Sequence, residues 1–431
     1  MIVIIGGGLA GLSTAYHLGE TDHVVLESES TPGGLCRSRE IDGFIFDYTG
    51  HLLHLRDPRA ISLVEDLLPG GLAETARKAV IRSRGVTLPF PYQANLHGLP
   101  PDFVARCIVE FVKTLDGEVP DDPATSFEDW ALSVFGQGIC DGFMFPYNEK
   151  LFRRSPKDMT ADWVSWAVPK PNLEEVVRGA TGVPNTGMGY NAKFRYPAHG
   201  GIGVLPEALA RRVRNLRCDC PVAAVDLDAR EVTLASGERL GYDRLVVTAP
   251  LPAFLAMASG GSLDWPSHTP RLDASVVACL NLGVAREGMG DGAHWIYFPD
   301  DDVPFYRAGF PSNFSDAVAP AGTSSMYVEM GLRKDEPYDP AALSATMEQG
   351  LLDSGLLLPD DKVLVRDLVR VDPGYVIFDR SRQKAMAELV PALAAHGVDL
   401  IGRYGAWTYS YMERAILDGL ETAESLHLAE E

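Results

Sequence analysis

The sequence predicts an α/β fold with a second, mixed α+β lobe. Three features predict it: an apolar run at residues 2–5 that leads into a glycine-rich turn and a helix, a second apolar run at 23–27, and interspersed strand and helix patterns over 255–385. A buried strand, a helix and a second strand in this order are typical of a parallel sheet. The chain has 431 residues, 46% of them hydrophobic, which is enough for two or three globular domains.

The glycine-rich turn has G-x-G-x-x-G spacing, formed by Gly6, Gly8 and Gly11. Gly6 permits a tight turn, Gly8 lets the backbone approach a pyrophosphate, and Gly11 lets helix and strand pack closely. The N-terminus of the following helix offers N–H groups to the phosphates. Glu27 ends the second strand, where an acid can bind a ribose hydroxyl. The sequence therefore predicts a Rossmann-type dinucleotide-binding domain.

A second glycine pair distinguishes between dinucleotides. Gly33 and Gly34 follow the acidic strand end in "ESESTPGGLCRS", and Arg37 follows them. A nicotinamide domain has no need of this pair. The segment resembles flavoproteins of the amine oxidase and phytoene desaturase type, where it covers the flavin side of FAD. "GFIFDYTGHLLH" is similar to their next segment, which implies that Gly50 and His51 lie near the isoalloxazine ring.

The C-terminal segment 399–426 reads as a strand, a glycine turn and a helix, and it resembles the last flavin-binding segment of the same class. The resemblance implies that Gly402 and Arg403 lie in the turn, and that Met412 and Glu413 open a helix whose N-terminus faces the flavin O2 side. The positive end of a helix dipole would stabilise negative charge on reduced flavin there.

Residues 221–250 read as short strands with a hairpin turn. The resemblance places the backbone of Val222 against adenine and implies a discontinuous, glutathione-reductase-like FAD domain. We expect the FAD domain at 1–85, 195–250 and 390–431, and the substrate lobe at 86–194 and 251–389.

In the substrate lobe, residues 100–190 are mostly helical in pattern, with Ser126 as an N-cap. The stretch "HWIYFPDDDVPFYRAG", residues 294–309, reads as a strand, a turn at the acidic tripeptide, and a second strand. Strand alternation would put four of its side chains on one face: Trp295, Tyr297, Phe305 and Arg307. That face is either plain core or the wall of a pocket.

Six segments in order resemble the UDP-galactopyranose mutases, especially the eukaryotic type. They are "LPFPYQANLHGLP", "FMFPYNEKLFRRSPKDM", "NAKFRYPAHGGIG", "HWIYFPDDDVPFYRA", "DPGYVIF" and "GRYGAWTY". The resemblance implies that Arg307 and Arg403 bind a diphosphate. It also implies substrate contacts from Trp295, Tyr297, Tyr375, Tyr409, Asn148 and Gln93. Forked guanidinium groups and hydroxyl donors suit a pyrophosphate.

The sequence also departs from that family. Ala167 stands where the family has an arginine, Phe152 replaces a tryptophan, and the C-terminal motif is two residues shorter than in the eukaryotic type. Arg153 and Arg154 either supply the missing charge or lie on the solvated surface. The sugar and the nucleotide base therefore stay open.

The resemblance implies a non-redox mutase in which N5 of reduced FAD attacks the anomeric carbon of a UDP-galactose-like substrate. An NAD(P)H reductant is implied, and Arg77 aligns with a family residue that serves NADPH. The alternative is an FAD-dependent amine oxidase or a protoporphyrinogen-oxidase-like dehydrogenase. A flavin-binding regulatory protein is a third possibility. The pair Arg307 and Arg403 favours the mutase, because oxidase sites are normally apolar around the flavin.

The formal net charge is −21, which argues against nucleic acid or anionic membrane as a general partner. No apolar run approaches the roughly 20 residues of a membrane span, and the N-terminus has no signal-peptide pattern. The six cysteines are scattered, and Cys218 with Cys220 makes a poor metal motif. We expect reduced thiols, no metal and a cytoplasmic location; the oligomeric state stays open.

Overall fold

The N-terminal glycine turn follows the central strand of a five-stranded parallel sheet with the order β20-β13-β1-β2-β9. The strands are β1 (Ile2–Ile5), β2 (His23–Leu26), β9 (Leu216–Arg217), β13 (Arg244–Val247) and β20 (Val398–Leu400). The computed structural model describes residues 1–428 except 165–167, 186–192 and 262. Every residue of β1 and β2 is buried, as expected for a parallel sheet covered on both faces. The predicted α/β class is confirmed.

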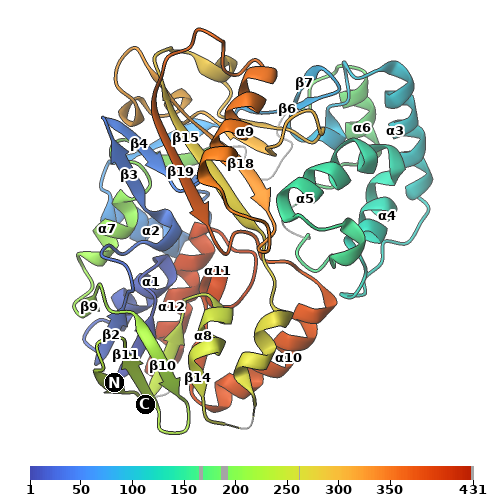
Figure 1. The fold of residues 1–431 in the computed structure, drawn as a ribbon. Coiled ribbons are helices and arrows are strands. Elements are labelled where there is room, and N and C mark those ends of the chain that lie inside the picture. The colour runs from blue at the N-terminus through green and yellow to red at the C-terminus, as the bar shows by residue number, and fades with distance from the viewer. Residues whose placement is uncertain (165–167, 186–192, 262, 429–431) are drawn as a thin grey trace.

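The first and last long helices lie side by side on this sheet (Figure 1). They are α1 (Leu9–Leu18) and α12 (Met412–Leu428). A Cβ added at Gly419 would come within 2.6 Å of the carbonyl oxygen of Ala10, so glycine lets the two backbones approach closely. The Ser13 hydroxyl also donates to the Ile416 carbonyl at 2.7 Å. The C-terminal segment is thereby fixed next to the glycine turn.

A four-stranded sheet with the order β12-β11-β10-β14 lies beside the parallel sheet and contains the predicted hairpin. Its strands are β10 (Val222–Asp226), β11 (Glu231–Leu234), β12 (Arg239–Gly241) and β14 (Ala258–Ser259). Helix α8 (Leu251–Met257) packs against β10, and α10 (Arg380–Ala395) packs against β20. These elements form the lower body in Figure 1.

A seven-stranded sheet with the order β19-β15-β18-β17-β16-β6-β7 forms the upper body. Its strands are β6 (Ala79–Ser83), β7 (Val86–Pro89), β15 (Val276–Val284), β16 (Trp295–Tyr297), β17 (Arg307–Gly309), β18 (Ser324–Leu332) and β19 (Val363–Val371). Helix α9 (Pro340–Asp353) packs against β15. Strand β6 pairs with β16 although it falls within the range 1–85. The domain boundaries stay a prediction.

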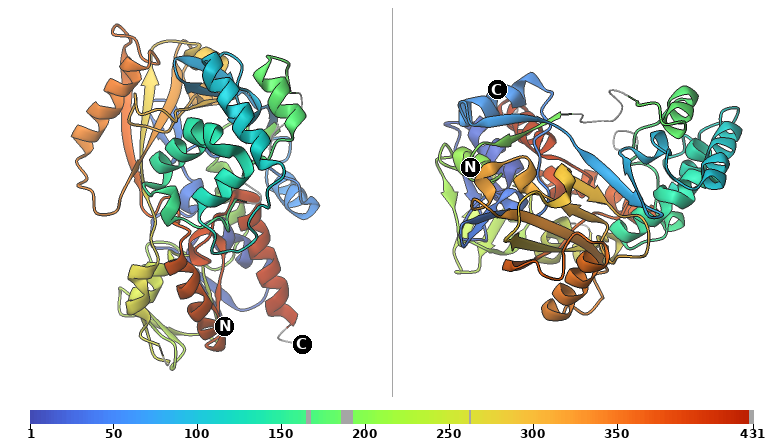
Figure 2. Two further views of the ribbon diagram at one scale, coloured as in Figure 1. Left: turned by 90° about the vertical axis from the view of Figure 1, so that its right-hand side faces the viewer. Right: turned by 90° about the horizontal axis from the view of Figure 1, so that it is seen from above.

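A helical subdomain stands beside this sheet, as two further views show (Figure 2). It comprises α3 (Pro101–Thr114), α4 (Phe127–Ile139), α5 (Phe145–Phe152) and α6 (Leu173–Ala180). The Ser126 hydroxyl accepts from the Asp129 N–H at 3.0 Å, which confirms the predicted N-cap. Smaller elements complete the fold: β3 (Ser38–Ile41), β4 (Phe44–Asp47), α2 (Pro58–Leu67), β5 (Leu72–Ala76), β8 (Lys193–Pro197), α7 (Val204–Ala210) and α11 (Gly402–Gly405).

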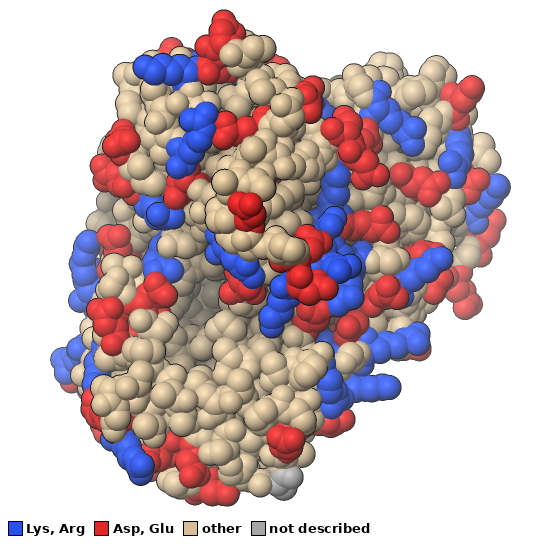
Figure 3. All heavy atoms as spheres, in the orientation of Figure 1, with Lys and Arg blue, Asp and Glu red and all other residues tan. Residues whose placement is uncertain are grey.

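The surface carries basic and acidic side chains intermixed (Figure 3). Arg153 pairs with Glu336 at 3.1 Å, and Arg154 pairs with Asp273, so both arginines lie at the surface with acidic partners. All six cysteines are free thiols. Among helices in the described part of the chain, none has both the length and the apolar character needed to cross a bilayer.

Candidate functional site

The three glycines of the first turn have the three steric roles that their spacing predicts. Gly6 has φ +106°, and a Cβ there would lie 2.4 Å from Oγ1 of Thr248. A Cβ on Gly11 would lie 2.0 Å from the carbonyl oxygen of Gly6, so helix and strand touch there. A Cβ on Gly8 would meet nothing within 4 Å. The chain thus leaves one open approach to the backbone at the N-terminus of α1, which fits a pyrophosphate.

Glu27 lies directly after β2 and is 7% exposed. Its carboxylate accepts from the N–H of Gly7 at 2.8 Å and from the N–H of Glu29 at 2.9 Å. These bonds orient the carboxylate toward the glycine turn, and ribose binding by Glu27 stays a prediction. Val222 opens β10 and pairs with Leu234, so its backbone lies at a strand end.

The second glycine pair packs directly on the first turn. The Gly33 N–H donates to the Gly7 carbonyl at 2.8 Å, and Gly33 forms a bridge with Gly8. Gly33 and Gly34 have φ values of +121° and +56°, which favour glycine. Arg37 donates through Nε to the Gly34 carbonyl at 2.9 Å and therefore braces the pair. The two turns form one continuous glycine-lined surface.

The C-terminal turn closes the same region from the other side. Gly402 has φ +71°, and a Cβ there would lie 2.9 Å from the Cβ of Ala10 in α1. Its N–H donates to Asp418 at 3.2 Å. Helix α12 begins at Met412, as predicted. These positions fit a flavin dinucleotide that extends from the glycine turns toward α12.

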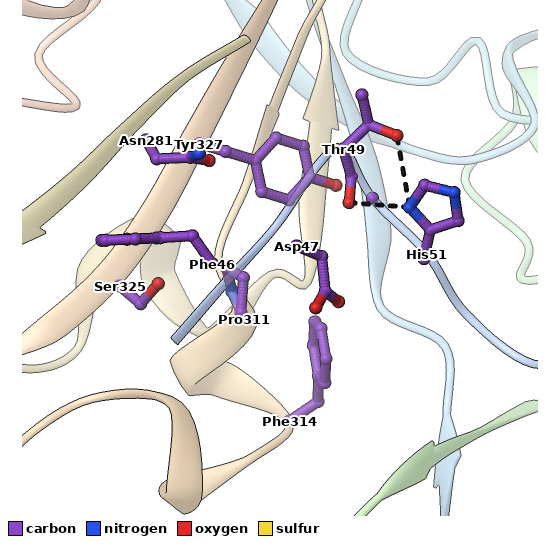
Figure 4. Close-up of a pocket in the computed structure, with 10 residues that line it drawn as sticks. Phe46, Asp47, Thr49, His51, Asn281, Pro311, Phe314, Ser325 and Tyr327 are labelled. Carbon is purple, nitrogen blue, oxygen red and sulfur yellow. Dashed lines mark hydrogen bonds between the residues drawn. The ribbon is translucent and has the colours of Figure 1, made fainter. Parts of the chain in front are cut away.

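His51 lies in a pocket between the β4 segment and β18 (Figure 4). The lining residues are Phe46, Asp47, Thr49, Gly50, His51, Asn281, Pro311, Phe314, Ser325 and Tyr327. A Cβ on Gly50 would lie 2.2 Å from the hydroxyl oxygen of Tyr327, so only glycine fits beside that ring. Nδ1 of His51 lies 3.2 Å from the Thr49 carbonyl. Burial is the main cause that lowers the pKa of His51 to about 4; the charges of Arg403 and Arg307 act in the same direction, and the Thr49 carbonyl and Glu329 oppose them. The imidazole is therefore neutral at neutral pH.

The stretch 294–309 contains two strands, β16 and β17, that pair with each other and place Tyr297 directly opposite Arg307. The expectation that Phe305 shares their face is wrong. Phe305 packs edge-on against Phe298 at 5.0 Å in another apolar cluster, because residues 298–306 form a loop without strand alternation. Trp295 is 7% exposed and packs 6.2 Å from the Phe194 ring.

The acidic tripeptide in that loop has a structural role that the sequence did not indicate. The Asp300 carboxylate accepts from the Ser83 hydroxyl at 3.1 Å. Nζ of buried Lys150, in α5, donates to the carbonyl oxygens of Val303 at 2.8 Å and Phe298 at 3.2 Å, among others of the loop. The loop is thereby tied to the helical subdomain.

Arg307 forms a buried, two-pronged ion pair with Glu329, a residue that sequence reasoning missed. Nε lies 3.1 Å from Oε2, and Nη2 lies 2.8 Å from Oε1 and 2.6 Å from Oε2. The Glu329 side chain is 0% exposed and that of Arg307 is 18% exposed. Burial disfavours the charge on Arg307, but Glu329 and the nearby tyrosines together outweigh this effect and raise the arginine pKa. The available signal was an acid within the apolar strand "SSMYVEMGL". A buried carboxylate is costly unless it is paired, so its presence there indicates a basic partner.

Arg403 has a different environment, made of neutral groups. Nη1 donates to the Ser410 carbonyl at 3.0 Å, while Nε is buried without a hydrogen-bond partner among the described residues. Its guanidinium carbon lies 5.2 Å from the ring centres of both Tyr375 and Tyr409. Aromatic faces attract a cation, so these rings hold Arg403 without neutralising it.

The predicted tyrosines gather around the two arginines. The ring centres of Tyr375 and Tyr409 are 6.1 Å apart. Burial raises the pKa of both hydroxyls, and the charges of the two arginines oppose part of that rise. Tyr147, also missed, packs edge-on against Tyr297 at 5.4 Å. Its adjacency to Asn148 in "PYNEK" was the available signal.

Two predicted substrate residues are engaged elsewhere. The amide of Asn148, in α5, donates to the carbonyl of Met144, the N-cap residue of that helix, at 2.6 Å. The amide of Gln93 donates to the Pro169 carbonyl at 2.6 Å. Phe152, which replaces a family tryptophan, packs 5.8 Å from the Tyr375 ring. Ala167 lies outside the described residues.

Comparisons with known proteins identify the family and the fold. Residues 9–294 match the family of flavin containing amine oxidoreductases. Among solved structures, reduced UDP-galactopyranose mutase superposes with a TM-score of 0.93 at 32% identity, covering 100% of this chain and 96% of that chain. A putative protoporphyrinogen oxidase from Exiguobacterium sp. 255-15 has a TM-score of 0.75 at 16% identity over 99% and 98% of the two chains, a likeness of fold alone.

Among curated proteins, coproporphyrinogen III oxidase of Mycobacterium bovis is 25% identical over 282 residues. The match covers 60% of this chain and 60% of that relative, which is less than two thirds of its length. The corresponding enzyme of Mycobacterium leprae is 25% identical over 66% of this chain and 67% of its own.

The parallel sheet, the paired glycine turns and the N-terminus of α12 define a flavin-binding protein of the two-lobed dinucleotide type. The chain belongs to the family of flavin-containing amine oxidoreductases, as a UDP-galactopyranose mutase-like member.

Proposed function

We propose that the chain is a flavin-dependent pyranose/furanose mutase that isomerises a UDP-galactose-like nucleotide sugar without net oxidation. The observation that carries the proposal is that two partly buried arginines, Arg307 and Arg403, lie among three tyrosines beside the His51 segment. The likeness to reduced UDP-galactopyranose mutase over the whole chain supports it.

The chain's own residues would bind and orient the substrate. Nε–H of Arg403 has no acceptor among the described residues, and Arg307 uses Nε and Nη2 for Glu329, so that Nη1 would be its edge toward a ligand. Two such donors suit the oxygens of a diphosphate. The hydroxyls of Tyr297, Tyr375 and Tyr409 would donate hydrogen bonds to the diphosphate or the sugar. Trp295 would line the sugar side. Neutral His51 adds no charge beside the ring system.

When bound in its reduced form, FAD supplies the nucleophile for the anomeric carbon. We propose NAD(P)H as its reductant. The guanidinium of Arg77 lies 4.8 Å from the centre of the Phe90 ring, and that ring packs 5.3 Å from the ring of Tyr297.

The test is to reduce the holoenzyme with dithionite, add UDP-galactopyranose and other nucleotide sugars, and separate the products by chromatography. We expect an isomerised nucleotide sugar from the reduced protein, many turnovers per flavin, and none from the oxidised protein. Absence of an isomer from every reduced reaction would remove the mutase proposal.

The second candidate is an FAD-dependent oxidoreductase of the amine or porphyrinogen type. The identity to coproporphyrinogen III oxidases favours it. The arginines beside the tyrosines oppose an amine substrate, since a cationic amine would be repelled by their charge. Oxygen consumption with peroxide formed in step with product, from oxidised enzyme, would establish this candidate instead.

A further inference from the structure

The register of the seven-stranded sheet places Glu329 directly opposite Arg307. These two residues are cross-strand partners in β17 and β18, and Arg307 is in turn opposite Tyr297 in β16. Directly opposite side chains in an antiparallel pair are close enough to interact. The ion pair is therefore set by the backbone ladder and not by a mobile surface contact.

The Glu329 carboxylate accepts hydrogen bonds from three residues in two segments of the chain. Besides Arg307, it accepts from the Tyr306 hydroxyl at 2.7 Å and from the Gly50 N–H at 3.2 Å. Gly50 precedes His51, so one carboxylate joins the predicted flavin-side segment to the predicted substrate arginine. Tyr327, two residues earlier on the same face of β18, fills the space between Gly50 and Gly309.

We propose that Glu329 is a positioning residue for Arg307, and this inference rests on the proposed function. By taking Nε and Nη2, the carboxylate fixes the guanidinium plane and leaves Nη1 as the edge available to a ligand. It also reduces the charge of the three groups: two arginines and one glutamate give +1 instead of +2. The site would then bind a diphosphate more through the fixed orientation of Arg307 than through net positive charge.

The two effects predict a split between binding and turnover. Glu329→Gln removes the negative charge, which strengthens anion binding, and breaks the two-pronged pair, which frees the orientation of Arg307. For reduced holoenzyme we expect kcat with UDP-galactopyranose to fall by about tenfold or more. The Kd for UDP should change by about threefold or less, because the gain in charge offsets the loss of orientation.

Glu329→Asp is the conservative variant and guards against a folding defect in the glutamine variant. Aspartate keeps the charge but is one methylene shorter, so stability should be closer to wild type while kcat stays low. The matched control is Glu348→Gln, because Glu348 makes a two-pronged pair with Arg366 at 2.8 and 3.0 Å on the surface. That control should leave kcat, Kd and flavin content unchanged.

A double-variant comparison separates positioning from a merely structural role. If Glu329 acts through Arg307, adding Glu329→Gln to the Arg307→Met variant should not lower kcat any further. The inference is overturned if Glu329→Gln leaves kcat unchanged in FAD-loaded protein. It is also overturned if Glu329→Gln lowers kcat by the same factor in the wild type and in the Arg307→Met variant. A wild-type holoenzyme that binds no UDP removes the proposed function and this inference together, whereas a wild type that binds UDP alongside an unaffected variant removes the inference alone.

Discussion

Gly8→Ala should weaken FAD binding without destabilising the folded apoprotein. Gly8 has φ −74° and ψ 179°, which any residue adopts, and an added Cβ meets nothing within 4 Å. The protein without FAD therefore has room for the methyl group. The pyrophosphate is expected in that same open space, so FAD and the methyl group compete for it.

The magnitudes follow from the steric surroundings. A Gly→Ala change at a compatible backbone position stabilises by about 0.4–1 kcal/mol through the unfolded chain, and glycine's slight advantage over alanine at an N-cap offsets part of this. The unfolding free energy of the apoprotein should thus stay within about 1 kcal/mol of wild type. Lost charge-assisted hydrogen bonds to phosphate cost about 1.5–3 kcal/mol each, which corresponds to an FAD Kd raised by about 10- to 100-fold.

The assay is urea unfolding of deflavinated protein together with FAD titration by flavin fluorescence quenching. Gly11→Ala gives the contrast: its Cβ would lie 2.0 Å from the Gly6 carbonyl oxygen, so apoprotein stability should fall sharply. Gly241→Ala is the control, since its nearest neighbour is 3.9 Å away on an exposed strand. An FAD Kd for Gly8→Ala within threefold of wild type would refute the placement of the pyrophosphate.

Three further predictions concern the second lobe and pH. Arg403→Ala should raise the Kd for UDP by about 10- to 100-fold with an intact flavin spectrum, since its charge is not compensated, and calorimetry measures this. Lys150→Met should lower the free energy of unfolding by about 1–3 kcal/mol by leaving loop carbonyls without donors, whereas Lys157→Met, at an exposed ion pair, should change it by less than about 0.5 kcal/mol. Lowering the pH from about 6.5 to 4 should destabilise the protein, because the unfolded His51 imidazole takes up a proton that the folded one, with its pKa lowered to about 4, does not. His51→Gln should reduce that loss in urea titrations at several pH values.

Local patterns allowed most of the cofactor half to be predicted. The strand, glycine turn and acid at Gly6 to Glu27 depend on neighbours in sequence, and their geometry is as expected. The start of α12 at Met412 also followed from a short motif. The packing of α12 on α1 did not, because it depends on Gly419, whose meaning appears only when the two helices meet.

The substrate half showed where sequence patterns fail. Alternation placed Tyr297 and Arg307 on one face, and the strands confirm it. The same rule failed for Phe305, because the intervening loop is fixed by Lys150 from a helix more than a hundred residues earlier. Glu329 was missed for a related reason: its partner is set by sheet register, which one sequence does not display.

The two arginines assigned the same role therefore differ physically. Arg307 lies opposite a fully buried carboxylate, and its net contribution to the field in the site is small. Arg403 lies among tyrosine faces and backbone carbonyls, which orient it and leave its charge intact. A diphosphate entering this site would be attracted by Arg403 and aligned by Arg307. The attracting charge thus comes from Arg403 on the C-terminal turn, and the alignment comes from Arg307 in the seven-stranded sheet. The two residues come together only when the two lobes are assembled.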